Sequence, residues 1–455
     1  MFASIQMTTV PTMVLICLML IGVGANAAAF AQTLYRHRKQ RDKDSDAQRS
    51  KINIFKVTLP LVGTVVFLAM LVATAVGYPP ELPESIKAAI NSVMTPASVL
   101  IFGTLSLLAA YIFRRYWVVP PIPILLLDLI LVLFCLSLRD PYFAATVGRE
   151  DNVAIVGLVF LFLIFGWVAI AQGVANDQRI ARTADPGRGR EGRPIEASIR
   201  NKAYAWPDLV YIELIASLAI CAVLIVWSLL MPAPLLHPAD PSITPNPAKA
   251  PWYFLGLQEL LLFFDPWYAG VAIPCLIIFG LAAIPYLDNN KEGSGYYTID
   301  RRRFAIIVFN LGLGLWLLLI IVGTIFRGPN WSFFGPYEHP DPHRTETVVG
   351  SSLSSYVWGQ STETATATAP TLASNKHPLV RELPGLALLA AYFIGVPILL
   401  GRTIMRARKQ QMRAGRFYLM MFLLMSMATV PIKMFGYWIF HLRYIIYFPE
   451  IGLNL

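Results

Sequence analysis

The chain has 455 residues, of which 56% are hydrophobic and only 14% are charged, and its mean hydropathy is positive. These values exclude an ordinary soluble globular protein and predict an all-α, polytopic membrane protein. The net charge of +10 does not indicate nucleic-acid binding, because the basic runs flank hydrophobic segments and lack interleaved aromatic platforms. We therefore expect the lipid bilayer, and no nucleic acid, as the partner of these charges.

Apolar runs long enough to cross a bilayer, about 20 residues each, recur along the whole chain. The first is too long for a signal peptide and its positive charges follow it, so we expect a true span and no cleavable signal. Ten candidate spans lie at 9–32, 54–77, 92–113, 121–138, 153–173, 208–231, 267–287, 304–326, 383–401 and 416–440.

Basic residues gather in alternate loops. With ten alternating crossings, one set of loops holds 27 of the 37 Lys and Arg, and the positive-inside rule makes that set cytoplasmic. This orientation places both termini outside the cytoplasm. The five loops in question are 34–56, 114–120, 174–207, 288–303 and 402–416.

The cysteines and histidines predict no metal or haem site in this chain. The cysteines lie inside apolar segments without paired spacing, at Cys17, Cys135, Cys221 and Cys275. No histidine lies in the middle of a span; they are His37, His237, His339, His343, His377 and His441. The run EHPDPHR at 338–344 could bind a metal, but its proline-rich polar setting favours a solvated or partner-facing loop.

Composition divides the chain into five parts. A low-complexity stretch, STETATATAP at 361–370, marks the fourth part as a loop that is either flexible or ordered only by a neighbour. We expect a five-helix N-terminal extension (1–173), a basic cytoplasmic linker (174–207), a central domain (208–335), an extracytoplasmic flexible loop (336–382) and two C-terminal transmembrane helices (383–455).

Two ionisable residues within predicted spans call for an explanation. Asp128, in PILLLDLILVLF, is either a functional group or a protonated or hydrogen-bonded structural acid, because an ionisable side chain at such depth is costly. Lys433 lies closer to its helix end, where we expect it to extend its ammonium group toward the membrane surface.

Three motifs in the second half resemble the C-terminal part of cytochrome b, the part called subunit IV where it is a separate chain. They are NKAYAWPDLVYIELIA (201–216), TPNPAKAPWYFLGLQELL (244–261) and FRGPNWSFFGPYE (326–338). The resemblance covers roughly 200–340, with a weaker similarity in the last residues, and is strongest to bacterial quinol:cytochrome c reductases. The five preceding spans have no counterpart in the short subunit IV.

The resemblance implies a Rieske/cytochrome b complex in which quinol, more readily menaquinol than ubiquinol, is oxidised near the outer face and protons leave outward. Its b haems and Rieske [2Fe-2S] cluster would be held by partner chains. The implied partners are a haem-binding chain carrying the N-terminal half of cytochrome b, the Rieske protein and a c-type cytochrome or plastocyanin-like acceptor. The complex would be dimeric and lie in the bacterial cytoplasmic membrane.

In the family, a Pro-Glu-Trp-Tyr motif lines the quinol-oxidising pocket. The aligned residues here are Ala250, Pro251, Trp252 and Tyr253, so proline replaces the glutamate that helps to take a proton from quinol. The resemblance therefore implies a pocket wall without its usual acid. The expected quinol-binding residues are Pro251, Trp252, Tyr253, Phe254 and Leu257.

Glu259 is the best substitute proton acceptor. If Pro251 opens a helix, Glu259 follows two turns later on roughly the same face, together with Leu255. An apolar pocket would raise its pKa, as suits a group that accepts and then releases protons. The alternatives are a helix-surface acid or one end of a salt bridge to a partner chain. Asp265 is a weaker candidate, because Asp before Pro is also an ordinary helix-entry residue.

Other residues have supporting roles by resemblance. Arg327 and Trp331 lie on the side of the pocket, where they would hold the loop or contact the iron-sulfur partner. The inner quinone and haem side would involve Arg200, Lys202, Tyr204 and Trp206. Two rival functions are a non-catalytic scaffold, which the replacement by Pro251 permits, and an ion or solute transporter, which Asp128 alone supports.

Overall fold

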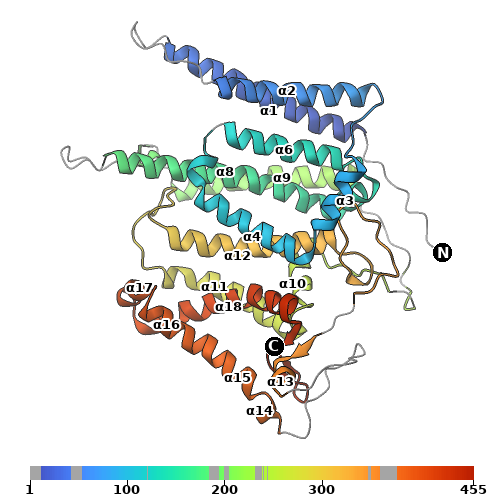
Figure 1. The fold of residues 1–455 in the computed structure, drawn as a ribbon. Coiled ribbons are helices and arrows are strands. Elements are labelled where there is room, and N and C mark those ends of the chain that lie inside the picture. Colours follow the sequence, from blue (N-terminus) through green and yellow to red (C-terminus); the bar gives the residue numbers. More distant parts are fainter. Residues whose placement is uncertain are drawn as a thin grey trace.

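The computed structural model describes residues 12–41, 54–119, 121–183, 194–198, 204–230, 238, 240–242, 244–346, 350–358 and 377–455. The chain is all-α apart from a few short strands (Figure 1). Within these residues, eight helices are long and apolar enough to cross a membrane, or up to ten if each of two bent pairs is one span. The predicted number and positions of the spans agree with this arrangement.

The N-terminal block is a stack of helices in which α3 and α4 meet at 89° and α6 and α7 at 111°. Both bends follow from the sequence, because Pro96 and Pro141 start the second helix of each pair. The helices are α1 (Thr12–Arg41), α2 (Ile54–Ala75), α3 (Glu84–Val93), α4 (Pro96–Ile112), α5 (Arg114–Trp117), α6 (Pro121–Ser137), α7 (Pro141–Val147) and α8 (Glu150–Thr183).

The central block contains the motifs that carry the resemblance. Short 3-10 or π turns precede or follow its longer helices. Its elements are η1 (Ile195–Ser198), η2 (Ala205–Leu209), α9 (Val210–Leu230), η3 (Trp252–Phe254), α10 (Leu255–Leu260), η4 (Tyr268–Ala272), α11 (Ile273–Leu287), α12 (Arg303–Ile321), η5 (Val322–Phe326) and η6 (Pro329–Trp331).

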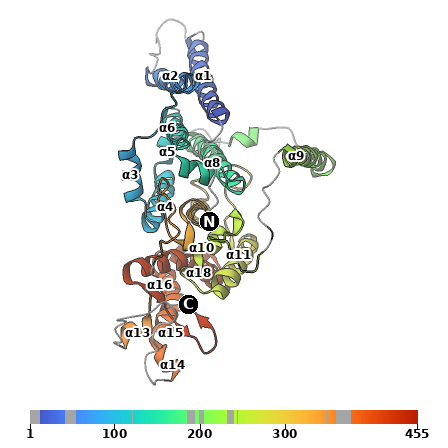
Figure 2. The same ribbon diagram turned by 90° about the vertical axis from the view of Figure 1, so that its right-hand side faces the viewer.

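Helix α9 differs from the other spans, because all of its residues are exposed. Figure 2 shows it apart from the remaining helices. A helix that is apolar on every side needs lipid or another protein around it.

The C-terminal block wraps back toward the central block. Its elements are β1 (Ser351–Ser352), α13 (Leu353–Val357), α14 (Pro378–Arg381), α15 (Leu383–Ala390), η7 (Ala391–Gly395), α16 (Val396–Arg402), α17 (Arg406–Gln411), α18 (Ala414–Phe440), β2 (Leu442–Tyr444), β3 (Tyr447–Phe448) and β4 (Leu453–Asn454). Strand β1 pairs in parallel with β2, and β3 pairs antiparallel with β4. Part of the predicted flexible loop is thus ordered in β1 and α13, whereas its low-complexity stretch lies outside the described residues.

The largest core joins α10, the start of α11, and the end of α18 with the last residues of the chain. Leu260, Phe264 and Tyr268 pack there against Val430 and Phe448, among others. A buried ion pair joins α14 to the last residues of the chain. Arg381 donates to the Glu382 carboxylate at 3.0 Å and to the Tyr447 carbonyl at 2.7 Å. The carboxylate of Glu382 also accepts from the Tyr447 N–H at 3.0 Å.

The N-terminal block packs against α12 where two glycines remove steric bulk. A Cβ added at Gly314 of α12 would collide with Leu107, and one added at Gly103 of α4 would collide with Leu318. Near the outer loop, the Ser137 and Tyr337 hydroxyls lie 2.7 Å apart and the Tyr337 N–H donates to Asn91 at 3.2 Å. The two blocks therefore share both an apolar and a polar contact.

We predict that Gly314→Val weakens this packing. The added methyl groups must displace Leu107, and such overpacking costs about 1–3 kcal/mol. The thermal midpoint of the detergent-solubilised protein should fall. Gly166→Val on α8 is the matched control, since a Cβ there meets no atom within 4 Å. Equal midpoints for the two variants would contradict this helix contact.

Candidate functional site

The proline-rich stretch before α10 is held in shape by the side chain of Gln258. Its amide oxygen accepts from the Ala250 N–H at 2.9 Å, and its amide nitrogen donates to the Ala248 carbonyl at 2.8 Å. Lys249 donates to the Thr324 carbonyl at 2.9 Å and so ties the same stretch to η5. These bonds fix the chain just before the aromatic triplet Trp252–Phe254.

A turn and a short helix replace the single helix predicted from Pro251. Pro251 precedes the 3-10 turn η3, and the α-helix α10 begins only at Leu255. Leu255 and Glu259 share the buried face of α10, as their spacing predicts. Pro251 itself is exposed, so it does not face the same environment as Glu259. The change of helix type alters the angle between successive residues and accounts for this difference.

Glu259 is buried in a bidentate ion pair. Its side chain is 1% exposed and that of Arg327 is 2% exposed. The Arg327 Nε and Nη2 atoms donate to the two carboxylate oxygens at 2.9 and 2.7 Å. The Trp331 indole N–H donates to the same carboxylate at 3.1 Å. A fork-to-fork pair with a third donor is a strong, geometrically specific arrangement.

Arg327 is positioned by the loop that follows η5. Its Nη1 donates to the Trp331 carbonyl at 2.9 Å and lies 3.4 Å from Glu346. Phe326 stacks on Phe333 with ring centroids 5.4 Å apart. Arg327 is therefore buried by its own loop and has a backbone carbonyl and two carboxylates as partners.

Burial and ion pairing act in opposite directions on the Glu259 carboxyl. Burial raises its pKa above the usual range, while the Arg327 guanidinium and the Trp331 N–H act to lower it. Burial is the largest of these effects, so the net pKa is raised.

The aromatic triplet forms a partly open rim beside this pair. Tyr253 is 46% exposed and Phe254 is 52% exposed, and the Trp252 and Tyr253 rings meet edge to face at 5.6 Å. Leu257 is partly buried and packs against the main core. The expected quinol-binding residues thus lie on one short segment, which continues into α10 with the buried ion pair of Glu259.

Asp265 ends the same loop at the entrance to the next span. Its Oδ2 accepts from the Asn454 side-chain amide at 2.6 Å. Its carbonyl accepts from the Tyr268 N–H at 3.0 Å, which is the helix-entry role that its sequence context allows. The structure therefore links Asp265 to the last residues of the chain.

The expectation that Lys433 reaches the membrane surface is wrong. Lys433 is 3% exposed, and its ammonium nitrogen lies 4.5 Å from the centroid of the Phe264 ring. This nitrogen has no hydrogen-bond partner among the described residues. The last residues fold over the end of α18 and enclose the side chain, which helix position alone does not reveal.

The residues expected on the inner side are only partly described. Tyr204 and Trp206 are 75% and 72% exposed, and the Trp206 ring stacks on that of Tyr211. Arg200 and Lys202 lie outside the described residues.

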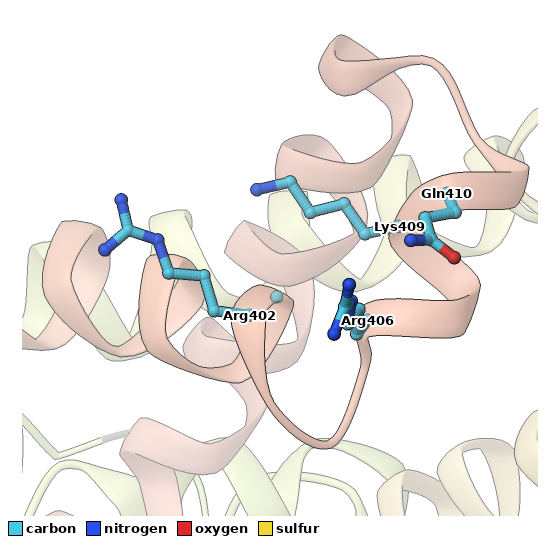
Figure 3. A pocket seen from close by; sticks show the side chains of 5 residues that line it. Arg402, Arg406, Lys409 and Gln410 are labelled. Carbon is cyan, nitrogen blue, oxygen red and sulfur yellow. The ribbon is translucent and has the colours of Figure 1, made fainter.

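Two open hollows lie near the ends of α16–α18, away from the aromatic triplet. Figure 3 shows Arg402, Arg406, Lys409 and Gln410 around one of them. Arg413 and Arg416 line the other. These cations belong to a predicted cytoplasmic loop, and the hollows take no part in the candidate site.

The described histidines do not suit haem ligation, because His339, His343 and His377 lie in loops and His441 follows the last helix. His339 instead packs against Tyr142, with ring centroids 5.0 Å apart. Among the described residues no group of three or more His, Cys, Asp and Glu could hold a metal ion.

The pairing of Glu259 with Arg327 was not predicted from the sequence. The prediction was only that Arg327 and Trp331 lie on the same side of the membrane as the quinol pocket. The two members of the pair lie 68 residues apart. One available signal was that each is a charged residue in an apolar stretch on the same predicted side of the membrane. Such residues are rarely buried without a partner.

We predict that breaking the pair from either side is costly and that removing both charges is not. Glu259→Leu and Arg327→Met should each cost about 3–5 kcal/mol, because one buried charge stays unpaired. The double variant should recover most of this loss in denaturant unfolding.

The matched control is the exposed pair of Arg344 and Glu338, which lie 2.6 Å apart in the same outer loop. Its coupling should be no more than about 1 kcal/mol. Additive effects at Glu259 and Arg327 would show that the two side chains are not paired.

A scan against known protein families matches residues 238–335 to the family described as cytochrome b(C-terminal)/b6/petD. No solved structure matches the chain. The matched range lies within the predicted range of 200–340 and contains the aromatic triplet, the ion pair, α11 and α12, whereas α9 precedes it. The family belongs to cytochrome bc/b6f-type oxidoreductase complexes of the membrane. Residues 238–335 of this multi-pass membrane protein thus match the family described as cytochrome b(C-terminal)/b6/petD.

Proposed function

We propose that this chain is the subunit of a Rieske/cytochrome b complex that contributes residues 244–265 to an outer-side quinol-oxidation site. The complex transfers electrons from quinol, of which menaquinol is the better candidate, to a cytochrome-type acceptor and releases protons outward. The observation that carries the proposal is the aromatic rim of Trp252, Tyr253 and Phe254 on a loop of the matched segment. The chain is not active alone.

The physical support for this proposal is that the aromatic loop is already held in one conformation before quinol binds. A flat quinol ring binds best where aromatic side chains are already positioned, since ordering a loop costs free energy on binding. Here Gln258 fixes the backbone before the triplet, and the ion pair of Glu259 fixes the helix after it. The rim is therefore restrained on both sides while its rings stay partly exposed.

The contacts of Glu259 favour a positioning role over the proton-accepting role that its sequence context predicts. Arg327 occupies both of its oxygens, and Trp331 donates to one of them. A general base has to lie within hydrogen-bond reach of the proton that it takes. Proton acceptance by Glu259 stays a prediction, with Asp265 as the second candidate.

The partners in this proposal are a haem-binding chain with the N-terminal half of cytochrome b, a Rieske [2Fe-2S] protein and a c-type cytochrome. The fully exposed α9 offers an apolar surface for such a chain. We place the complex, as a dimer, in a bacterial cytoplasmic membrane with both termini of this chain outside. Haem iron and the iron-sulfur cluster would supply one-electron chemistry from those partners.

The two rival functions, scaffold and transporter, have different structural requirements. A scaffold that has lost the chemistry needs Trp252 and Tyr253 only for packing. A transporter requires a substrate path through the spans, and Asp128 of α6 is the only residue that we offered in its support.

The test is purification of the complex through a tag on this chain. A b-type haem spectrum and a Rieske signal should co-purify, together with quinol:cytochrome c activity. Trp252→Ala should raise the quinol KM by up to about tenfold, since losing one aromatic contact costs about 0.5–1.5 kcal/mol. Tyr286→Ala, at an exposed tyrosine on α11, should leave the KM unchanged.

Glu259→Gln then separates the two roles of this acid. With Glu259 as a positioning residue, KM and thermal stability change but the pH profile of kcat keeps its shape. A shifted or flattened acidic limb would instead identify Glu259 as the proton acceptor. A haem-free preparation without activity would contradict the proposed function.

A further inference from the structure

Three helices of the N-terminal block meet at a polar cluster within the predicted membrane region. Asp128 of α6, Asn26 of α1 and Gly63 of α2 form it. Figure 1 shows α1, α2 and α6 side by side. None of these residues belongs to the segment that matches cytochrome b.

The side-chain amide of Asn26 uses both of its protons. Its nitrogen donates to Asp128 Oδ1 at 2.7 Å and to the Gly22 carbonyl at 3.1 Å. Asn26 is 2% exposed, and its Oδ1 has no hydrogen-bond partner among the described residues. A buried acceptor without a donor costs about 1–3 kcal/mol, so this oxygen calls for an explanation.

The second carboxyl oxygen of Asp128 faces the same space as this amide oxygen. A Cβ added at Gly63 would lie 2.6 Å from Asp128 Oδ2 and 2.7 Å from Asn26 Oδ1. Both oxygens therefore border the space that the missing side chain of Gly63 leaves open. Two acceptors cannot bond to each other unless one of them carries a proton.

The described side chains of α1 and α2, the two helices that form the cluster with α6, offer no charge to balance an ionised Asp128. The described side chains of α1 include Cys17 and Tyr35 as ionisable groups, and residues 57–75 of α2 include none. On α5, Arg114 donates to Asp300 at 3.0 Å and to the Tyr111 carbonyl at 3.2 Å. The remaining ionisable groups of α5 are Arg115 and Tyr116.

We propose that Asp128 and Asn26 form a proton-binding site in the N-terminal helices. The proton resides on Asp128 Oδ2 and is donated to Asn26 Oδ1, while Asn26 Nδ2 donates to Asp128 Oδ1. This closed pair of hydrogen bonds satisfies every polar atom of the two groups. A hard metal cation would need six or more oxygen ligands, whereas the two side chains supply two.

The site is separate from the proposed quinol chemistry and can be tested without it. The first readout is infrared difference spectroscopy of the full chain in lipid nanodiscs, comparing the wild type with Asp128→Asn. The wild type should show a protonated-carboxyl C=O band that moves on deuteration and is absent from Asp128→Asn. Glu81→Gln, at an exposed acid of the same block, should retain the band.

A second readout uses the unmodified protein, so it does not depend on the folding of a variant. A hydrophobic carbodiimide reacts with protonated carboxyl groups, and mass spectrometry should find the adduct on Asp128, falling in yield as pH rises. Carboxylate bands in place of the carboxyl band, or no adduct at acidic pH, would overturn the proposal. Protection of Asp128 by sodium ions at constant pH would also overturn it, in favour of a cation site.

Discussion

The buried ion pair between Glu259 and Arg327 is the interaction on which the geometry of the outer side depends. It joins α10 to the loop after η5, and its burial from water makes its hydrogen bonds strong and its disruption costly. Trp331 and Glu346 extend the same network into the outer loop. The aromatic triplet precedes α10 directly, so the position of the three rings follows from the position of this pair.

The same constraint bears on Pro251, which stands where the resemblance leads us to expect a glutamate. Pro251 restricts the backbone just before η3, while the acid of the region lies inside the protein and in contact with Arg327. In the sequence, aromatic residues and a carboxylate lie close together in this segment. In the structure, the aromatic rings are partly exposed, whereas the carboxylate of Glu259 is buried. Arg327 and Trp331 donate hydrogen bonds to this carboxylate.

The spans could be predicted from sequence because each depends on a local property, a run of apolar residues that matches the membrane thickness. The burial of Glu259 follows equally from its leucine-rich surroundings. Its pairing with Arg327 could not be derived, since it depends on how residues 68 apart fold together. Asp128 could be singled out from the sequence because it is an acid within an apolar run. Its partner Asn26 could not, because it lies 102 residues away on another helix. The enclosure of Lys433 and the pairing of β1 with β2 likewise depend on the return of the chain end.

Photoaffinity labelling of the intact complex with a photoreactive quinol analogue tests the central claim most directly, because it reports where quinol lies without altering the protein. The account predicts adducts within Trp252–Phe254 that excess quinol suppresses. Suppressible adducts confined to other segments, in a complex that oxidises quinol, would contradict the assignment of this loop to the quinol site.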